Sequence, residues 1–464
     1  METEIRPYVI EKLERIFNPK SIAVVGASRH PEKIGYRCLR NLIEGGFEGD
    51  IFPVNPNARE IFGIECYSDL SKVPQPVDLA LIVLPAEMCE KAIKSCIEKL
   101  VNGIAVVSSG FSEVGKKNLE ERIANLCRKN KIPLIGPNII GVLSNTSHCN
   151  ASFAQSLPYP GHLTFISQSG ALGIALIGRT WIDKIGLSKL VSIGNQADVD
   201  FAELISYFAE KDEDTHAICL YMEGLPKGKR FVEACKKASK IKPLIALKVG
   251  NSEKGSMAVQ SHTGSMAGQG AVYKGAFKQA GVIEAIDLGD LFDKALALSL
   301  QPPLKGDGVA VITNGGGAGV CATDAAELCN IPLKNPPASL KARMREWMPE
   351  FGSTKNPFDI TGLASKENYE GAAIDALEHQ WVDGAVILYC HSAQTAPQEI
   401  ADGIYHAVHS YRGPKKPVTV ALLGGIKCEE AALWLKERNI PTYPTPERAV
   451  SALSALREFG RVSQ

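Results

Sequence analysis

The sequence has no excess of charge, no long hydrophobic run and no clustered cysteines, and each absence excludes a class of protein. Its 51 Lys and Arg balance 51 Asp and Glu, whereas a general nucleic-acid binder needs an excess of basic residues to displace counterions. The longest apolar runs, such as residues 79–84, are too short to cross a bilayer. Residues 1–7 include two acidic residues and lack the apolar segment of a secretory signal. We therefore expect a cytoplasmic protein.

The 12 cysteines and 9 histidines also lack the spacings that indicate a metal or redox site. No two cysteines stand at the short spacing of a zinc or redox motif, and the histidines form no HxH or HxxxH pair. Most cysteines lie in apolar surroundings, where they behave as small buried hydrophobes. We expect no metal site.

What the sequence does contain is a regular alternation of apolar strands and helices. At 464 residues, 45% of them hydrophobic, it is long enough for about three domains. Short continuous apolar strands separated by helices are typical of parallel sheets covered on both faces. We predict an α/β protein of three consecutive doubly wound domains, with boundaries at 1–145, 146–302 and 303–464. The predicted strands cover 21–26, 50–54, 79–84, 104–108 and 131–135, then 163–167, 189–192, 217–221 and 243–248, and finally 308–313, 384–389 and 417–423.

Several predicted strands of the first domain end in loops suited to a ligand. The first ends in Gly26-Ala27-Ser28, a strand–glycine–helix turn that can present backbone N–H groups to a phosphate. It is no G-x-G-x-x-G fingerprint, and no acidic residue follows the second strand at Val54-Asn55-Pro56, so ordinary NAD binding is disfavoured. Together with the ends of the other strands, these loops favour a nucleotide-like ligand. Those other ends carry Pro85, Val107-Ser108-Ser109 and Asn138.

Two later strands each lead through small residues into a helix. Ser167-Gln168-Ser169-Gly170 opens the second domain, and its free N–H groups suit an anion, although a plain helix N-cap is an equally good interpretation. The third domain opens with Gly315-Gly316-Gly317-Ala318-Gly319, and so many glycines usually bring backbone close to a ligand. No Lys-Ser/Thr pair follows, so this is no P-loop.

His262 is the most distinctive candidate for catalysis. It stands among small residues in Ser261-His262-Thr263-Gly264, which we predict to be a mobile loop that leaves the ring accessible. A neutral imidazole can attack phosphorus near pH 7 if a partner fixes its tautomer. Glu223, just beyond a predicted strand, is the natural partner, although a lone carboxylate there could equally be a solvated surface group.

In this order, the motifs resemble the α subunits of NDP-forming acyl-CoA synthetases, specifically the archaeal ADP-forming acetyl-CoA synthetases, which are relatives of succinyl-CoA synthetase. The resemblance covers nearly the whole chain and implies a Rossmann-like CoA-binding domain followed by two flavodoxin-like ligase domains. It implies that His262 is phosphorylated, that Glu223 holds it, and that the two helix N-termini described above bind its phosphoryl group. The residues that would bind CoA are Gly26, Ala27, Ser28, Lys33, Val54, Asn55, Pro56, Pro85, Val107, Ser108, Ser109 and Asn138.

The resemblance also implies a partner. Nothing in the chain resembles an ATP-grasp domain, so ADP or ATP with Mg²⁺ is expected mainly on a separate β subunit, in an α2β2 heterotetramer. The implied reaction converts acyl-CoA, ADP and phosphate reversibly to carboxylate, CoA and ATP through an acyl phosphate and a phosphohistidine. One departure is Arg59, in the region where succinyl-CoA synthetases have a lysine that contacts CoA.

Two other functions compete with this interpretation. A CoA-binding regulatory protein without turnover would account for the first domain, but it would leave His262 and Glu223 without a role. A CoA transferase that needs no nucleotide would exchange thioesters without a partner chain. Acetate is the default expectation for the acyl group.

Overall fold

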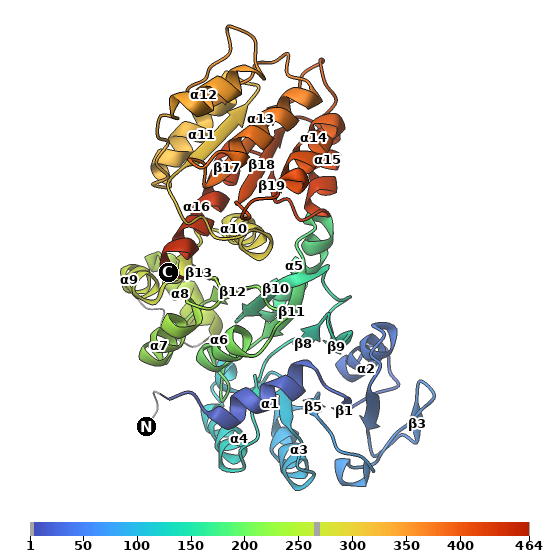
Figure 1. Cartoon of the computed structure of the whole chain (residues 1–464). Helices are drawn as coiled ribbons and strands as arrows, with labels where there is room; N and C mark the ends of the chain where they lie inside the picture. The colour runs from blue at the N-terminus through green and yellow to red at the C-terminus, as the bar shows by residue number, and fades with distance from the viewer. Residues whose placement is uncertain (1–3, 264–269, 464) are drawn as a thin grey trace. The chain divides into compact units, whose positions relative to one another are not determined.

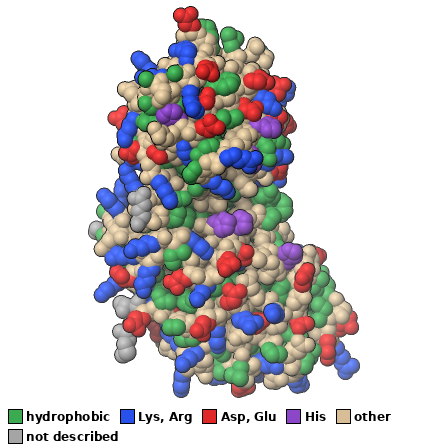
Figure 2. All heavy atoms as spheres, viewed as in Figure 1, with side chains coloured by type: hydrophobic (Ala, Val, Ile, Leu, Met, Phe, Trp, Pro, Cys, Tyr) green, Lys and Arg blue, Asp and Glu red, His purple; other side chains and the backbone are tan. Residues whose placement is uncertain are grey.

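The computed structural model describes residues 4–263 and 270–463, with side chains for 4–259 and 270–463. By its internal contacts the chain forms two compact units, Met1–Glu284 and Ala285–Gln464. The first unit contains two large sheets and the second contains one (Figure 1). On the face of the molecule shown in Figure 2, acidic and basic side chains are interspersed, in keeping with the balanced composition.

The first sheet is parallel and has the strand order β2-β1-β5-β6-β7. Its strands are buried on both sides: Ile22 and Val24 face one core, and Ala23 and Val25 face the other. Helices α1 and α2 cover the first face, and α3 and α4 cover the second. The strands are Ser21–Val25 (β1), Asp50–Val54 (β2), Leu79–Ile82 (β5), Gly103–Val106 (β6) and Leu134–Ile135 (β7); the helices are Pro7–Phe17 (α1), Ile34–Glu44 (α2), Ala86–Glu98 (α3) and Lys117–Lys129 (α4).

The second sheet also belongs to the first unit and has the order β14-β13-β12-β10-β11-β8-β9. An antiparallel hairpin, β8–β9, extends its parallel part at one edge. The sequence pattern did not predict this hairpin, because its two short strands carry no clear alternation. The strands are Gly141–Ser144 (β8), Cys149–Ser152 (β9), Pro160–Ser167 (β10), Leu187–Ser192 (β11), Ala217–Met222 (β12), Leu244–Lys248 (β13) and Ile283–Glu284 (β14); the helices are Gly170–Asp183 (α5), Phe201–Glu210 (α6), Gly228–Ala238 (α7), Glu253–Thr263 (α8) and Gly270–Ala280 (α9).

The second unit is built on a parallel sheet of order β16-β15-β17-β18-β19. Helices α12 to α15 share one hydrophobic core with this sheet, and α10 and α11 pack against α16. The strands are Val309–Thr313 (β15), Phe358–Asp359 (β16), Gly384–Cys390 (β17), Val418–Leu423 (β18) and Thr442–Tyr443 (β19); the helices are Leu288–Leu300 (α10), Gly316–Leu328 (α11), Ala338–Arg345 (α12), Lys366–Glu378 (α13), Pro397–Ser410 (α14), Ile426–Lys436 (α15) and Pro446–Val462 (α16). The α/β class predicted from the sequence is confirmed.

Candidate active site

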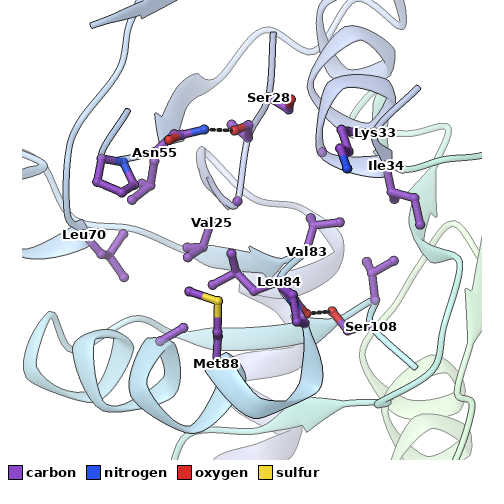
Figure 3. A pocket seen from close by; sticks show the side chains of 18 of the residues that line it. Val25, Ser28, Lys33, Ile34, Asn55, Leu70, Val83, Leu84, Met88 and Ser108 are labelled. Carbon is purple, nitrogen blue, oxygen red and sulfur yellow. Dashed lines mark hydrogen bonds between the residues drawn. The ribbon is translucent and has the colours of Figure 1, made fainter. Parts of the chain in front are cut away.

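A pocket of about 730 Å³ opens at the carboxyl ends of β1, β2, β5 and β6, where the loops that follow these strands converge (Figure 3). This is the edge at which parallel α/β sheets bind ligands. Every residue predicted to contact CoA, except Asn138, lines it: Gly26, Ala27, Ser28, Lys33, Val54, Asn55, Pro56, Pro85, Val107, Ser108 and Ser109. Asn138 instead donates from Nδ2 to Asn195 Oδ1 at 3.3 Å.

Close backbone contacts shape the pocket. Gly26 has φ +97°, and a Cβ there would lie 2.6 Å from the carbonyl oxygen of Val83. A Cβ on Gly35 would lie 2.1 Å from the carbonyl oxygen of Gly26. Only glycine therefore allows the turn after β1 and the helix after it to approach this closely.

Two polar side chains that line the pocket hold its loops together. Asn55 donates from Nδ2 to the carbonyl oxygen of Ala27 at 2.7 Å, and the Ser108 hydroxyl donates to the carbonyl oxygen of Leu84 (Figure 3). Asn55 Oδ1 accepts from the backbone N–H of Asn57 at 2.8 Å. These side chains fix the walls, so a ligand's phosphates would meet mainly backbone groups and lysines.

The cationic groups of the pocket are Lys33, before α2, and Lys91, on α3. The sequence analysis missed Lys91, although the pocket residues Met88 and Ser95 stand three and four positions away on the same helix face. Arg59, considered as a substitute for a CoA-contacting lysine, is exposed and is not among the described residues that line the pocket.

A second group of predicted residues meets at the carboxyl edge of the second sheet. Gln168 Oε1 accepts from the backbone N–H groups of Glu223, at 2.5 Å, and Gly224, at 3.0 Å. Glu223 is 6% exposed, so it is a buried carboxylate rather than a solvated surface group. Burial lowers the pKa of Lys248, at the end of the neighbouring strand β13, while the charge of Glu223 opposes this shift.

The serines of this motif cap helix α5. Ser169 is the N-cap residue, and its side chain accepts from the backbone N–H of Leu172 at 3.4 Å. Ser167 Oγ donates to the carbonyl oxygen of Ser169 at 2.8 Å and accepts from its N–H at 3.1 Å. The N-cap interpretation therefore describes these side chains, and Gly170 begins the helix behind them.

His262 lies in the last turn of helix α8, so the predicted loop is a helix up to Thr263. Glu, Lys, Met, Ala and Gln, all good helix formers, make up much of this segment, and the small residues concealed that propensity. The His262 side chain and residue Gly264 lie outside what the structure describes.

The glycine-rich motif of the second unit is also mostly helical. Helix α11 begins at Gly316, so Gly316, Gly317, Ala318 and Gly319 form its first turn, with Gly315 as the N-cap. A Cβ on Gly315 would lie 2.8 Å from the sulfur of Cys390, whereas one on Gly317 would meet nothing within 4 Å. Packing therefore requires glycine at 315, while the backbone at 317 is open to an approaching group.

Comparison with known proteins decides the family. Residues 20–145 match the CoA binding domain, 160–298 the succinyl-CoA ligase like flavodoxin domain, and 309–464 the Ligase-CoA domain. The chain is 47% identical over 455 residues to the α subunit of acetate–CoA ligase [ADP-forming] I of Pyrococcus furiosus, covering 97% of this chain and 98% of that one. The chain belongs to the family of ADP-forming acetate–CoA ligase α subunits.

A solved structure and a longer relative extend this result. The chain superimposes with a TM-score of 0.94, at 43% identity, on acetyl-coenzyme A synthetase 1 of Ca. Korarchaeum cryptofilum, solved with phosphate and ADP; the match covers 97% of each chain. An ADP-forming acetate–CoA ligase of Methanocaldococcus jannaschii is 39% identical, and the match covers 97% of this family member but 63% of that longer protein.

No described helix of this family member is long and apolar enough to cross a membrane. Among the described side chains, those of residues 4–259 and 270–463, no group of three or more His, Cys, Asp or Glu is placed to hold a metal ion.

Proposed function

We propose that this chain is the α subunit of an ADP-forming acyl-CoA synthetase, which converts acyl-CoA, ADP and phosphate reversibly to carboxylate, CoA and ATP. The observation that carries the proposal is the pocket at the carboxyl edge of the first sheet, lined by Gly26, Lys33 and Lys91, in a chain that matches a ligase α subunit over 97% of its length. CoA is the substrate that this pocket is proposed to take, with Lys33 and Lys91 facing its phosphates.

The reaction would begin with attack of phosphate on the thioester carbon. The carbon–sulfur bond breaks, CoA leaves as the thiolate, and an acyl phosphate forms. His262 then attacks the phosphorus, the bond to the acyl oxygen breaks, and the carboxylate leaves. The buried carboxylate of Glu223 would hold the other ring nitrogen of His262 and stabilise the charge that develops on the ring. The phosphoryl group finally passes to ADP.

The helix N-termini of α5 and α11 are proposed to bind the phosphoryl group. Gly170 opens α5, and Gly316, Gly317, Ala318 and Gly319 form the first turn of α11. The partial positive charge of each N-terminus is worth about 1 kcal/mol toward an anion. The side chains of Ser167 and Ser169 would act indirectly, by holding the first turn of α5 in place.

The partner is proposed to be a β subunit with an ATP-grasp domain, which binds ADP with Mg²⁺, in an α2β2 heterotetramer. The relatives named as α subunits imply a second subunit, and the longer M. jannaschii protein has a further third that this chain does not match. Acetate is the proposed acid, because acetate–CoA ligases are the relatives at 47% and 39% identity.

Phosphohistidine labelling tests the proposal. The chain is mixed with acetyl-CoA and labelled phosphate, with and without a candidate ATP-grasp subunit, and the label is mapped. We expect acid-labile label on His262 that disappears in His262→Asn, while the variant keeps its fold. CoA binding without any label would instead favour a regulatory protein, and thioester exchange without a partner chain would favour a transferase.

A further inference from the structure

Gln168 was expected to contact phosphate, but its side chain binds two backbone N–H groups of the protein instead. Its side-chain amide follows strand β10 and bonds to two successive backbone N–H groups, those of Glu223 and Gly224, just beyond the neighbouring strand β12. Since both partners are donors, the atom that faces them is the amide oxygen. Gln168 therefore fixes the main chain that carries Glu223.

The second unit repeats this arrangement at the equivalent place. Ser167 pairs with Tyr221 across β10 and β12, and Thr313 pairs with Leu388 across β15 and β17. The residue that follows each first strand, Gln168 or Asn314, bonds to the residue two positions beyond that partner: Glu223 or Cys390. Asn314 Oδ1 accepts from Cys390 N–H at 2.7 Å, and its Nδ2 donates to the Cys390 carbonyl at 3.0 Å.

The two units differ in the residue whose backbone the amide side chain binds. An amide side chain that ties one strand end to the next is thus a structural feature common to both units. Only in the first unit does the tied residue carry a carboxylate, Glu223, and Cys390 occupies its place in the second. The amide side chain can therefore position a carboxylate only in the first unit, where Gln168 holds the backbone of Glu223.

The Glu223 segment is held from a second side as well. The backbone N–H of Leu225 donates to the side-chain hydroxyl of Tyr273 on helix α9. The Lys248 ammonium lies 4.8 Å from the centroid of the Tyr273 ring, and its charge interacts with Glu223. A buried carboxylate on a main chain fixed at Glu223, Gly224 and Leu225 has few positions available to it, which is what accurate placement of a catalytic group requires.

We propose that Gln168 is a positioning residue that acts through Glu223 and not by contact with the phosphoryl group. The proposal rests on the proposed function, because it assigns Gln168 a part in the transfer to His262. It predicts that loss of the Gln168 oxygen and loss of the Glu223 carboxylate damage the same step.

A double-mutant cycle of Gln168→Met and Glu223→Gln tests this. Met keeps the length of the side chain and removes the acceptor. In the complex with the ATP-grasp subunit, the rate constant for labelling by acetyl-CoA and labelled phosphate is measured for each variant. We expect Gln168→Met to slow labelling about 10-fold or more, to leave the KM for phosphate within about twofold, and to add less than about twofold in the Glu223→Gln background.

Gln301→Met is the matched control. Gln301 Oε1 likewise accepts a backbone N–H, from Val418 at 3.0 Å, outside the candidate site. We expect it to lower Tm about as much as Gln168→Met does, with an unchanged labelling rate. Equal slowing by the two variants would mean that Gln168 matters only for stability and would overturn the proposal.

Two further results would contradict it. Additive effects in the cycle, with a raised KM for phosphate in Gln168→Met, would show direct contact with phosphate and overturn this inference alone. A wild-type complex that acquires no label would overturn the proposed function and this inference together.

Discussion

Arg6 binds Glu203 through two hydrogen bonds, from Nε to Oε1 at 2.6 Å and from Nη2 to Oε2 at 2.8 Å, and so ties the start of helix α1 to helix α6. Its Nη1 also donates to Asp198 at 2.6 Å. The side chains of Glu203 and Asp198 are both 0% exposed. Arg128 also binds Asp198 and Arg230 also binds Glu203, so the three arginines form one network around two buried acids.

Arg6→Met should therefore destabilise the first unit. The change leaves two buried carboxylates with one cation fewer, which costs about 2–4 kcal/mol of the free energy of unfolding. Guanidinium titration measures it. As a control, Lys117→Met removes the exposed pair Lys117–Glu121, 3.8 Å apart, and should change stability by less than about 0.5 kcal/mol. Equal losses in the two variants would contradict a structural role for the network.

Lys91 gives a test of the pocket. Lys91→Met should raise the KM for CoA about 5-fold or more, because it removes a cation facing the proposed phosphates, and should leave kcat nearly unchanged. Lys94→Met is the control on the same helix, since Lys94 pairs with Glu90 at 3.0 Å and does not line the pocket. Steady-state kinetics over a range of CoA concentrations measure both. A KM raised equally by both changes would indicate a general charge effect.

Glu113 should make stability depend on pH. Burial raises the pKa of this carboxyl, but hydrogen bonds from Asn195 and from the backbone N–H groups of Gly110 and Phe111 outweigh it, and the pKa lies below its ordinary value. The unfolded state then binds the proton more readily, so the stabilisation is present at neutral pH and is lost as pH falls through the lowered pKa.

Glu113→Gln should accordingly cost about 1 kcal/mol at pH 7, with a difference from wild type that shrinks below about pH 4. Urea titrations at several pH values measure this. A difference that stays constant down to the acid range would show that the hydrogen bonds do not depend on the charge of Glu113.

Cys321 should react faster than the other thiols. It is the exposed cysteine, Cys329 and Cys390 are half-buried, and the remaining nine are buried. Burial raises the pKa of Cys38 and Cys96 to about 12, which leaves almost no thiolate at neutral pH. A thiol reagent should label the native protein rapidly at one site, and Cys321→Ser should abolish that fast phase. If several thiols reacted as fast as Cys321, the other cysteines could not be buried as the structure shows.

The sequence predicted the central parallel strands, because they are continuous apolar runs, but it missed the β8–β9 hairpin and the two-residue strands β14, β16 and β19. Residues 50–54 and 308–313, for example, match β2 and β15 to within one residue. The pocket was also predictable, since strand ends in a parallel sheet share one edge and Gly26 marks a forced turn. Lys91 was missed because a lysine on an amphipathic helix resembles any solvated residue until the partner loops are in place.

The site at the second sheet was less predictable. The sequence placed Glu223 at a strand end, but only tertiary packing shows that it is buried and that Gln168 holds its backbone. The segment around His262 was expected to be a loop because Gly and Ser are frequent there, yet the helix formers among them prevail up to Thr263. Roles inferred from local composition fail where long-range contacts decide the outcome.

The packing of helix α10 determines where a chimera between this protein and a relative should have its crossover. The matched succinyl-CoA ligase like domain runs to residue 298, yet α10 packs within the unit that begins at Ala285. The Tyr443 hydroxyl donates to the carbonyl of Asp293 at 2.8 Å, and Arg448 Nη2 donates to its carboxylate at 2.7 Å. A chimera joined near residue 302 would set one parent's α10 against the other's α16, whereas a crossover at 284/285 inherits both helices from the same parent.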